Sequence, residues 1–485
     1  MNYDDVMKLA LERGFYFPSC EIYGDAQAGF WEYGPSGVSL KNKYLELWRR
    51  ELVRRDGMLE IDGSQIMSQS VFEASGHLTS FADPIIKCKN CKSTFRVDKL
   101  IAELTKMEIP ESASLSEFDK TISEKNIKCP RCQGDFENTR KFNMMFKVGV
   151  GPDGDAAYLR PETCQSIFVD FPRIFKTMRG KLPLGVAQVG KSFRNEISPR
   201  QSLLRLREFY QAEVEVFCNP KRLNYFEKFE EVQNTEIRIQ IGDKPQKMTC
   251  RKAVESNTIP NRLVAFYLGI LSEFYEKTGI DMTKSRYRRL EEREKAFYAE
   301  AAFDFEVETN LGWLELVACN YRSDYDLGGH ATKSNEKFEV LDEEEKVLPH
   351  VFEISMGIDR SLYAILEHSL RDDKENDRLV LSIKPYLAPI QVGVLSLVKK
   401  DGLKEKTDEI FMMLKKKYDA FLDHAGAIGR RYRRLDEIGA PFALTVDHQT
   451  LDDQTVTVRS RDSMNQERIK ISEIDPFLSK AVSFP

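Results

Sequence analysis

The chain has 485 residues, of which 41% are hydrophobic and 31% are charged, and its formal net charge is −5. This composition is globular, with enough apolar residues for a large core, and the length favours two to four domains. No run of about 18 apolar residues occurs, which argues against a membrane span. With a pI near 5.9, a nucleic-acid partner would have to be bound by local basic patches rather than by the overall charge.

The N-terminal segment reads MNYDDVMKLALERGF, with early acidic residues and the apolar spacing of a helix. It lacks the basic start and apolar stretch of a signal peptide, so we expect a cytoplasmic protein. Residues 34–37 (GPSG) predict a turn, residues 38–55 an amphipathic helix and residues 58–61 a strand. The helix would pair with its own copy in a dimer or lie on the surface.

Four of the nine cysteines form two CxxC pairs, at positions Cys88, Cys91, Cys129 and Cys132. Two such knuckles supply four thiolates to one tetrahedral metal ion, which is typical of structural zinc, although iron is also possible. The alternatives are disulfides, which a reducing cytosol disfavours, or a redox motif, which does not explain two copies. The middle of this insert, residues 86–140, predicts polar helices. The other cysteines are expected to be buried apolar residues: Cys20, Cys164, Cys218, Cys250 and Cys319.

After the insert, the sequence AAYLRPETCQSIFVDF predicts a strand, a charged turn at residues 160–163 and a helix. A long hairpin follows, with strands on both sides of FRNEISPRQSLLRLREF at residues 193–209. Because strand side chains alternate between faces, Phe209, Gln211 and Glu213 should point the same way. Polar groups on one face indicate a wet cleft, beside which arginine forks suit phosphate. A charged surface hairpin is the alternative.

Residues 219–300 are charged and predict mostly helix, including a solvated helix at 288–300. Residues 302–334 predict two strands joined by a tight Asn-Leu-Gly turn. The sequence PHVFEISMGIDRSLYAILEHSL predicts a strand running into a helix, with Glu353, Ser355 and Arg360 near the junction. Charged groups at such a junction are well placed to meet a ligand.

A change in pattern at Lys384-Pro385 indicates a separate α/β domain of about 100 residues with a βαβαββ order. Its first helix is expected to run to His424. Four arginines around Tyr432, at positions 430–434, predict either an RNA-binding patch or the solvated start of a helix.

Three segments in this order resemble the motifs of class II aminoacyl-tRNA synthetases: GPSGVSLKNKYLELWRREL resembles motif 1, FRNEISPRQSLLRLREF motif 2 and MGIDRSLYAIL motif 3. Nearly end to end, the chain resembles the dimeric glycyl-tRNA synthetases of archaeal and eukaryotic type. The resemblance implies an α/β (α+β) fold with an antiparallel-sheet catalytic domain over 1–384, carrying a zinc-ribbon-like insert at 86–140 and a further insert at 219–300. It also implies an anticodon-binding domain over 385–485 and a homodimer.

The resemblance further implies an ATP site. Arg194 would bind the α-phosphate, Arg205 would reach the γ-phosphate, and Arg360 would cover the triphosphate from the other side. Glu196 would fix the adenine end and Phe209 would stack on the adenine. Glu315, in GWLEL, resembles the carboxylate that holds Mg²⁺ with the phosphates.

Glycine would be bound by carboxylates in three segments: Glu162 in RPET, Glu213 in AEVE, and Glu353 with Ser355 in Glu-Ile-Ser. In the family this last segment is Glu-Pro-Ser, so Ile354 replaces a proline. The segments ASGHLTSFADP and NYRSDYDLGGH also resemble family signatures, and Arg322 in the second would contact the substrate.

The implied reaction is ATP-dependent attachment of glycine to tRNA(Gly) through a glycyl-adenylate, with release of pyrophosphate and AMP. The rivals are other synthetases of the subclass, a stand-alone adenylating enzyme, and the non-catalytic accessory subunit of mitochondrial DNA polymerase. The accessory subunit should lack the arginines of motifs 2 and 3, whereas Arg194, Arg205 and Arg360 are present. A stand-alone enzyme would lack the C-terminal domain, and the three glutamates favour glycine.

Overall fold

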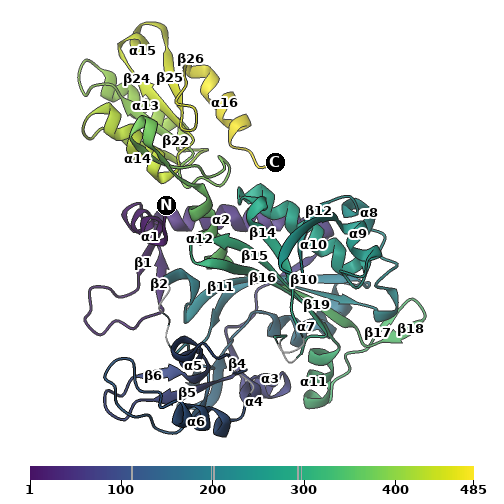
Figure 1. Cartoon of the computed structure of the whole chain (residues 1–485). Coiled ribbons are helices and arrows are strands. Elements are labelled where there is room, and N and C mark those ends of the chain that lie inside the picture. Colours follow the sequence, from purple (N-terminus) through teal and green to yellow (C-terminus); the bar gives the residue numbers. More distant parts are fainter. Residues whose placement is uncertain (111–112, 198, 200–201, 292–293, 296–297) are drawn as a thin grey trace.

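The structure is a computed structural model that describes residues 1–485 except 111–112, 198, 200–201, 292–293 and 296–297. Figure 1 shows a central part built on one large sheet, a smaller part below it, and a C-terminal part above it. Within the described residues, no helix is both long and apolar enough to cross a membrane.

The central part is organised by a nine-stranded sheet in which neighbours are mostly antiparallel. The exceptions are two parallel pairs, β12 with β14 and β10 with β3. In spatial order the strands are β13 (Lys244–Thr249), β12 (Glu236–Ile241), β14 (Ser285–Arg289), β15 (Ala301–Thr309), β16 (Gly312–Ser323), β19 (His350–Gly357), β11 (Glu208–Cys218), β10 (Leu184–Phe193) and β3 (Leu59–Ile61). The predicted antiparallel catalytic sheet is therefore confirmed.

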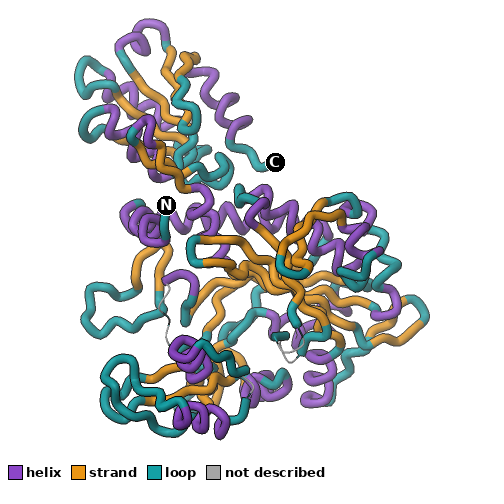
Figure 2. Tube along the Cα trace, viewed as in Figure 1, coloured by secondary structure: helices purple, strands orange, loops and turns teal. Residues whose placement is uncertain are grey.

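Helices cover one face of this sheet, above the strands in Figures 1 and 2. These are α2 (Pro35–Trp48), α10 (Arg262–Thr278) and α12 (Ile358–Ser369), whose buried residues share one apolar core with α1 (Tyr3–Glu12). A second core lies on the opposite face, where α7 (Cys164–Thr177) packs with α11 (Tyr325–Ser334). A polar cavity opens on this same face, over β11, β15, β16 and β19.

The turn predicted at residues 34–37 is the start of α2. Gly34 caps the helix and Pro35 occupies its first turn, where the missing N–H of proline costs nothing. Helical structure continues through a π-helical segment at Arg49–Arg54.

Residues 219–300 are not mostly helical, so that prediction is wrong. They contain α8 (Phe229–Val232), α9 (Cys250–Glu255) and α10, but also β12, β13 and β14 of the central sheet. Ile237 and Ile239 are buried on the helix side while charged residues alternate with them, a period of two. The helix predicted over 288–300 begins inside β14; no helix is present among its described residues, and 292–293 and 296–297 lie outside them.

The cysteine insert forms a small unit with its own apolar core. It has three strands, β5 (Ala82–Lys87), β6 (Thr94–Arg96) and β7 (Arg140–Asn143), and two helices, α5 (Val97–Thr105) and α6 (Leu115–Glu124). The predicted helices are present, while residues 111–112 between them lie outside the described part.

The shorter elements of the central part form small sheets and single turns around the large sheet. They are β1 (Tyr16–Pro18) with β2 (Trp31–Tyr33); β4 (Ile66–Ser68) with β9 (Asp155–Leu159) and β8 (Lys147–Val150); β17 (Val340–Asp342) with β18 (Glu345–Val347); β20 (Leu370–Asp373) with β21 (Arg378–Leu381); α3 (Gln69–Ala74) and α4 (His77–Ser80).

The C-terminal part has a five-stranded sheet and a separate apolar core. Its strands are β23 (Ala420–Asp423), β22 (Val392–Ser396), β24 (Phe442–Val446), β25 (Thr455–Ser460) and β26 (Gln466–Lys470), and its helices are α13 (Leu403–Leu414), α14 (Ile428–Ile438), α15 (His448–Asp453) and α16 (Ile474–Ala481). The helix predicted to reach His424 ends at Leu414, and β23 follows it.

The predicted arginine patch at residues 430–434 does not form a single surface. Arg431 is buried and donates to the carbonyl of Ser396, while Arg434 pairs with Asp423 at the end of β23. Of these four arginines, only Arg430 and Arg433 are exposed. Helical spacing turns the arginines to different sides, which a count of charges along the sequence does not reveal.

Candidate active site

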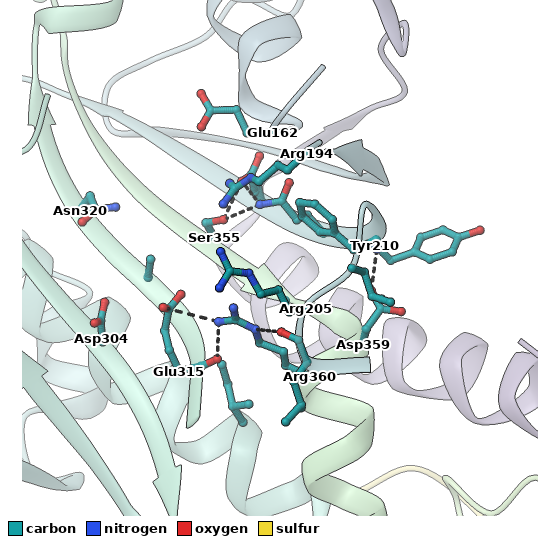
Figure 3. A pocket seen from close by; sticks show the side chains of 18 of the residues that line it. Glu162, Arg194, Arg205, Tyr210, Asp304, Glu315, Asn320, Ser355, Asp359 and Arg360 are labelled. Carbon is teal, nitrogen blue, oxygen red and sulfur yellow. Dashed lines mark hydrogen bonds and ion pairs between the residues drawn. The ribbon is translucent and has the colours of Figure 1, made fainter. Parts of the chain in front are cut away.

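A polar cavity of about 500 Å³ opens on the sheet face opposite α10 and α12. It is lined from β11, β15, β16 and β19, from the loop after β10, and from the start of α12 (Figure 3). Ten of the eleven residues predicted for the ATP and glycine sites line it: Glu162, Arg194, Glu196, Arg205, Phe209, Glu213, Glu315, Glu353, Ser355 and Arg360.

Strand alternation directs the polar side chains of β11 into the cavity. Phe209, Gln211 and Glu213 line it, whereas Val214 and Val216 are fully buried in the helix-side core. The long hairpin is confirmed, with Phe209 opposite Ser192 and Glu213 opposite Gln188. Residues 198 and 200–201 of the connecting loop lie outside the described residues.

Glu213 is held by three hydrogen bonds at the inner end of the cavity. Its Oε1 accepts from Ser355 Oγ at 2.6 Å and from Gln211 Nε2 at 2.9 Å, and its Oε2 accepts from Thr163 Oγ1 at 2.6 Å. Burial raises its pKa and the charge of Glu162 adds to this, while the bonds from Ser355 and Thr163 oppose the shift. The carboxyl is therefore fixed in place. Its raised pKa favours protonation, and a cation beside it would favour the ionised form instead.

Glu162 lies in the turn between β9 and α7, beneath the same end of the cavity. Gln165 Nε2 donates to its Oε1 at 2.8 Å, and His77 Nε2 lies 3.4 Å from that oxygen. Although burial alone would raise its pKa, the neighbouring His77 and the more distant Arg322 hold the pKa well below the ordinary value. Glu162 is thus an ionised buried carboxylate.

Glu353 is held by Arg322 and Asn320, with Nη1 of Arg322 at 2.8 Å from Oε1 and Nδ2 of Asn320 at 2.6 Å from Oε2. Burial raises its pKa to about 7 although Arg322 acts in the opposite direction. Ile354, which replaces the family proline, is fully buried in the helix-side core, and β19 runs regularly through it. The substitution therefore leaves Glu353 and Ser355 side by side on the cavity face.

Arg322 is the predicted site residue that does not line the cavity. It is fully buried, binds both carboxylate oxygens of Asp326 at 2.6 and 2.8 Å, and holds Glu353 from behind. Its guanidinium is thus hydrogen-bonded to two carboxylates and lies 3.8 Å from that of Glu162, so the structure places it as a support for Glu353 rather than as a wall of the cavity.

Glu215 is a buried acid that the sequence reasoning missed. It lies opposite Glu353 across the β11–β19 pair and is fully buried. Both of its carboxyl oxygens lack a hydrogen-bond partner among the described residues. Burial raises its pKa well above the ordinary value, and the adjacent Glu353 raises it further.

Three arginines line the cavity: Arg205 and Arg360 lie together at its outer end, whereas Arg194 lies nearer Ser355 (Figure 3). The Arg194 guanidinium lies over the Phe209 ring at 5.3 Å, and its Nε donates to the carbonyl of Pro161. Arg205 forms an ion pair with Glu196, with Nη2 at 2.6 Å from Oε2. Guanidinium groups of this kind bind phosphate oxygens in a forked geometry.

Arg360, on the first turn of α12, also faces this end. It donates to the carbonyls of Leu204 and Glu315 and lies 3.5 Å from the Glu315 carboxylate. The preceding residue, Asp359, accepts from Tyr33 Oη at 2.6 Å and from the Tyr210 backbone at 2.7 Å, which ties α12 to β11.

Glu315 and Asp304 bring two carboxylates to the cavity from adjacent strands, β16 and β15. Burial raises the pKa of Asp304 to about 7, and the nearby charge of Glu315 contributes. Oxygen ligands from carboxylates, together with phosphate oxygens of a substrate, suit Mg²⁺. These residues therefore fit the predicted ion.

The four insert cysteines converge, although the two CxxC pairs are far apart in sequence. The Sγ atoms of Cys88 and Cys132 are 3.5 Å apart, and those of Cys91 and Cys129 are 3.6 Å apart. All four sulfurs lie within 4.8 Å of one another. Zn–S bonds of about 2.3 Å in a tetrahedron give sulfur separations of roughly 3.8 Å, so the cluster fits a metal ion.

Comparisons with known proteins agree with this architecture. Residues 113–239 match the class II tRNA synthetase core domain (G, H, P, S and T), and residues 391–481 match an anticodon-binding domain. Two solved structures from Cryptosporidium parvum share the fold, each with a TM-score of 0.60 over 99% of this chain. One is the RNA-binding domain of threonyl-tRNA synthetase (17% identity, 98% of that chain), and the other is prolyl-tRNA synthetase (14% identity, 75% of that chain). Fold and site together define a class II aminoacyl-tRNA synthetase.

More similar relatives identify the family within this class of synthetases. The glycine–tRNA ligase of Methanocaldococcus jannaschii is 38% identical over 573 aligned positions, covering 99% of this chain and 98% of the relative. Those of Methanococcus maripaludis and Methanothrix thermoacetophila are 36% and 38% identical, covering 98% and 97% of this chain and 99% and 95% of those relatives. The chain belongs to the glycine–tRNA ligase family.

Proposed function

We propose that this protein attaches glycine to tRNA(Gly) in two steps, first forming glycyl-adenylate from glycine and ATP and then transferring the glycyl group to the tRNA. The observation that carries the proposal is the division of one cavity into two ends. Three mutually interacting carboxyls, from Glu162, Glu213 and Glu353, line the inner end, and Arg205 and Arg360 line the outer end, with Arg194 close to Ser355 (Figure 3). The first suits an ammonium group and the second a triphosphate.

In the first step the glycine carboxylate attacks the α-phosphorus of ATP and pyrophosphate leaves. The protein contributes position and charge, because no covalent intermediate on a side chain is needed. Arg194 is assigned to the α-phosphate, Arg205 to the γ-phosphate and Arg360 to the triphosphate as a whole. Arg205 would leave its ion pair with Glu196, freeing Glu196 to meet the adenine that stacks on Phe209.

Mg²⁺ is assigned to Glu315 together with the phosphates, with Asp304 lining the same cavity from the adjacent strand. When bound, the ion would neutralise charge on the leaving pyrophosphate. Each carboxylate has an arginine beside it: Arg288 lies 3.3 Å from Asp304, and Arg360 lies 3.5 Å from Glu315. The residues present can therefore exchange an internal ion pair for the ion and its phosphates.

The glycine ammonium is assigned to Glu162, Glu213 and Glu353, with Ser355 orienting Glu213 through its 2.6 Å hydrogen bond. Arg322 is assigned to holding Glu353 rather than to contact with glycine. A cation entering this site would lower the pKa of Glu213 and of Glu353, so binding favours their ionised forms.

The remaining assignments concern assembly. The four-cysteine cluster is assigned to a structural zinc ion, since four thiolates leave no open coordination position for catalysis. The C-terminal α/β unit is assigned to the anticodon, and α2 to the interface of a homodimer.

Amino-acid-dependent ATP–pyrophosphate exchange tests the proposal. Each standard amino acid would be supplied in turn without tRNA, and we expect exchange with glycine alone. Glu213→Gln should abolish it while leaving ATP binding measurable. Exchange with a different amino acid would refute the glycine assignment but keep the class, and exchange with none, before or after addition of tRNA, would refute the adenylation step.

A further inference from the structure

An aromatic side chain borders the amino-acid end of the cavity in addition to the carboxyls. Tyr298, in the segment between β14 and β15, lines the cavity together with Glu162, Asn320 and Glu353. We propose that the Tyr298 ring is the wall that excludes amino acids larger than glycine. This inference rests on the proposed function, because it names the specificity-determining residue of the same site.

The ring has a rigid backing. The guanidinium carbon of Arg322 lies 3.7 Å from the centre of the Tyr298 ring, which is direct stacking contact. Arg322 is itself immobilised by two bonds to Asp326 and one to Glu353. Because Tyr298 lines the cavity and the fully buried Arg322 does not, the ring separates the guanidinium from the cavity.

The carboxyls cannot provide the selectivity by themselves. Every amino acid carries the same ammonium and carboxylate groups, so Glu162, Glu213 and Glu353 would bind them all. Glycine offers no side chain to hold, and discrimination must therefore come from steric exclusion of others. A flat ring stacked on a fixed cation resists displacement more than a flexible aliphatic chain would.

The side chains nearest this end are otherwise small or polar. Ala318, Asn320 and Ser355 line the same region, and Ser355 and Asn320 are already bonded to Glu213 and Glu353. Among the described lining residues at this end, Tyr298 is the aromatic one. Replacing it by a small residue would open space toward the Arg322 guanidinium. The amino acids that would then enter are small ones, with serine able to donate or accept hydrogen bonds there.

The experiment compares Tyr298→Ala, Tyr298→Val and Tyr298→Phe with the wild type in ATP–pyrophosphate exchange with glycine, alanine and serine. We expect Tyr298→Ala and Tyr298→Val to raise the alanine-to-glycine ratio of kcat/KM by roughly 10- to 200-fold, the usual range for one methyl-sized difference. Tyr298→Phe keeps the ring and should keep the wild-type ratio. Tyr225→Ala, at a position that is 80% exposed, is the matched control.

Binding measurements make the result independent of turnover. Calorimetry with the non-hydrolysable sulfamoyl analogues of glycyl- and alanyl-adenylate should show the same change in preference. An unchanged preference in variants that still bind the glycyl analogue would overturn the proposal. Loss of the glycyl analogue in both small variants, with circular dichroism unchanged, would also overturn it, because Tyr298 would then hold the glycine site rather than exclude side chains.

The wild-type protein distinguishes a failure of the proposed function from a failure of this inference. Wild-type protein that gives no glycine-dependent exchange and binds no glycyl analogue would refute the glycine site itself. Wild-type protein that activates glycine, while Tyr298→Ala still rejects alanine as the wild type does, would refute only the role of Tyr298.

Discussion

Replacing Glu215 by glutamine should stabilise the protein relative to the wild type, by a margin that grows as the pH rises. Glu215 is fully buried, and neither carboxyl oxygen has a hydrogen-bond partner among the described residues. Its pKa is raised by burial and by the neighbouring Glu353. The folded protein therefore keeps a proton on Glu215 at pH values where the unfolded chain has lost it, and uptake of this proton opposes folding.

The size of the effect follows from counting that proton. Above the unfolded pKa of about 4.3, and up to the raised folded pKa, the wild type loses about 1.4 kcal/mol of stability per pH unit through this group. Glutamine has nearly the same shape and takes up no proton. From about pH 5.5 up to the raised folded pKa of Glu215, the margin should therefore grow by about 1.4 kcal/mol per pH unit, or roughly 1.5 °C in Tm per pH unit for a folding unit of several hundred residues.

Differential scanning calorimetry of both proteins across this pH range measures the margin. Glu344→Gln, at an exposed position in the β17–β18 turn, controls for the substitution itself. A margin that stays constant with pH would mean that Glu215 binds no extra proton on folding. A variant less stable than the wild type at the higher pH would mean that Glu215 is ionised and paired with Arg322, and either result refutes the reasoning.

Three further predictions concern the cavity and the insert. The pKa of about 7 for Glu353 predicts that kcat/KM for glycine falls as the pH is lowered through about 7, because the protonated carboxyl no longer attracts an ammonium group; a flat profile in pyrophosphate exchange would contradict this. Arg360→Ala should lower the exchange rate by about 100-fold or more, while the exposed Arg433→Ala should not, and equal rates would remove Arg360 from the reaction. Cys91→Ser should lose the metal, expected at about one ion per chain by elemental analysis, whereas Cys20→Ser should retain it. Equal metal contents in these two variants would refute the four-cysteine site.

Much of the cavity was predictable because its chemistry lies on regular local patterns. The alternation of Phe209, Gln211 and Glu213 along one strand places them on one face whatever the rest of the chain does. The junction of β19 with α12 likewise brings Ser355 and Arg360 to one edge of the sheet. The CxxC spacing fixes each pair of cysteines locally, and two pairs together indicate one ion.

The residues that escaped prediction depend on contacts between distant segments. Glu215 faces Glu353 only because β11 pairs with β19 in a particular register, across 138 positions of sequence. The role of Arg322 has the same origin: the sequence predicts a substrate contact, but the pairing of β16 with β19 places Arg322 behind Glu353. Nothing in the local sequence distinguishes a glutamate in the cavity wall from one buried behind it.

The error over residues 219–300 has a different cause. One face of β12 and β13 is buried in the apolar core shared with α10, through Ile237, Ile239 and Met248. The same two strands also carry the charged residues Arg238, Lys244 and Lys247. Charge density of this kind is typical of a solvated helix, and a run of six residues is too short for the period of two to stand out. The alternation becomes decisive only once α10 is known to cover that edge.

The geometry of β11 links the two ends of the cavity into one substrate site. Phe209 and Glu213 are four residues apart on the same face, which corresponds to about 14 Å along an extended strand. The Arg194 guanidinium lies over the Phe209 ring. Glu213, at the acidic end, accepts a hydrogen bond from Ser355. A nucleotide joined through its α-phosphate to a small amino acid has a comparable extended length. A single strand therefore sets the distance between the adenine and ammonium sites, so a one-residue deletion between them would turn Glu213 to the helix side and should abolish amino-acid activation rather than merely weaken it.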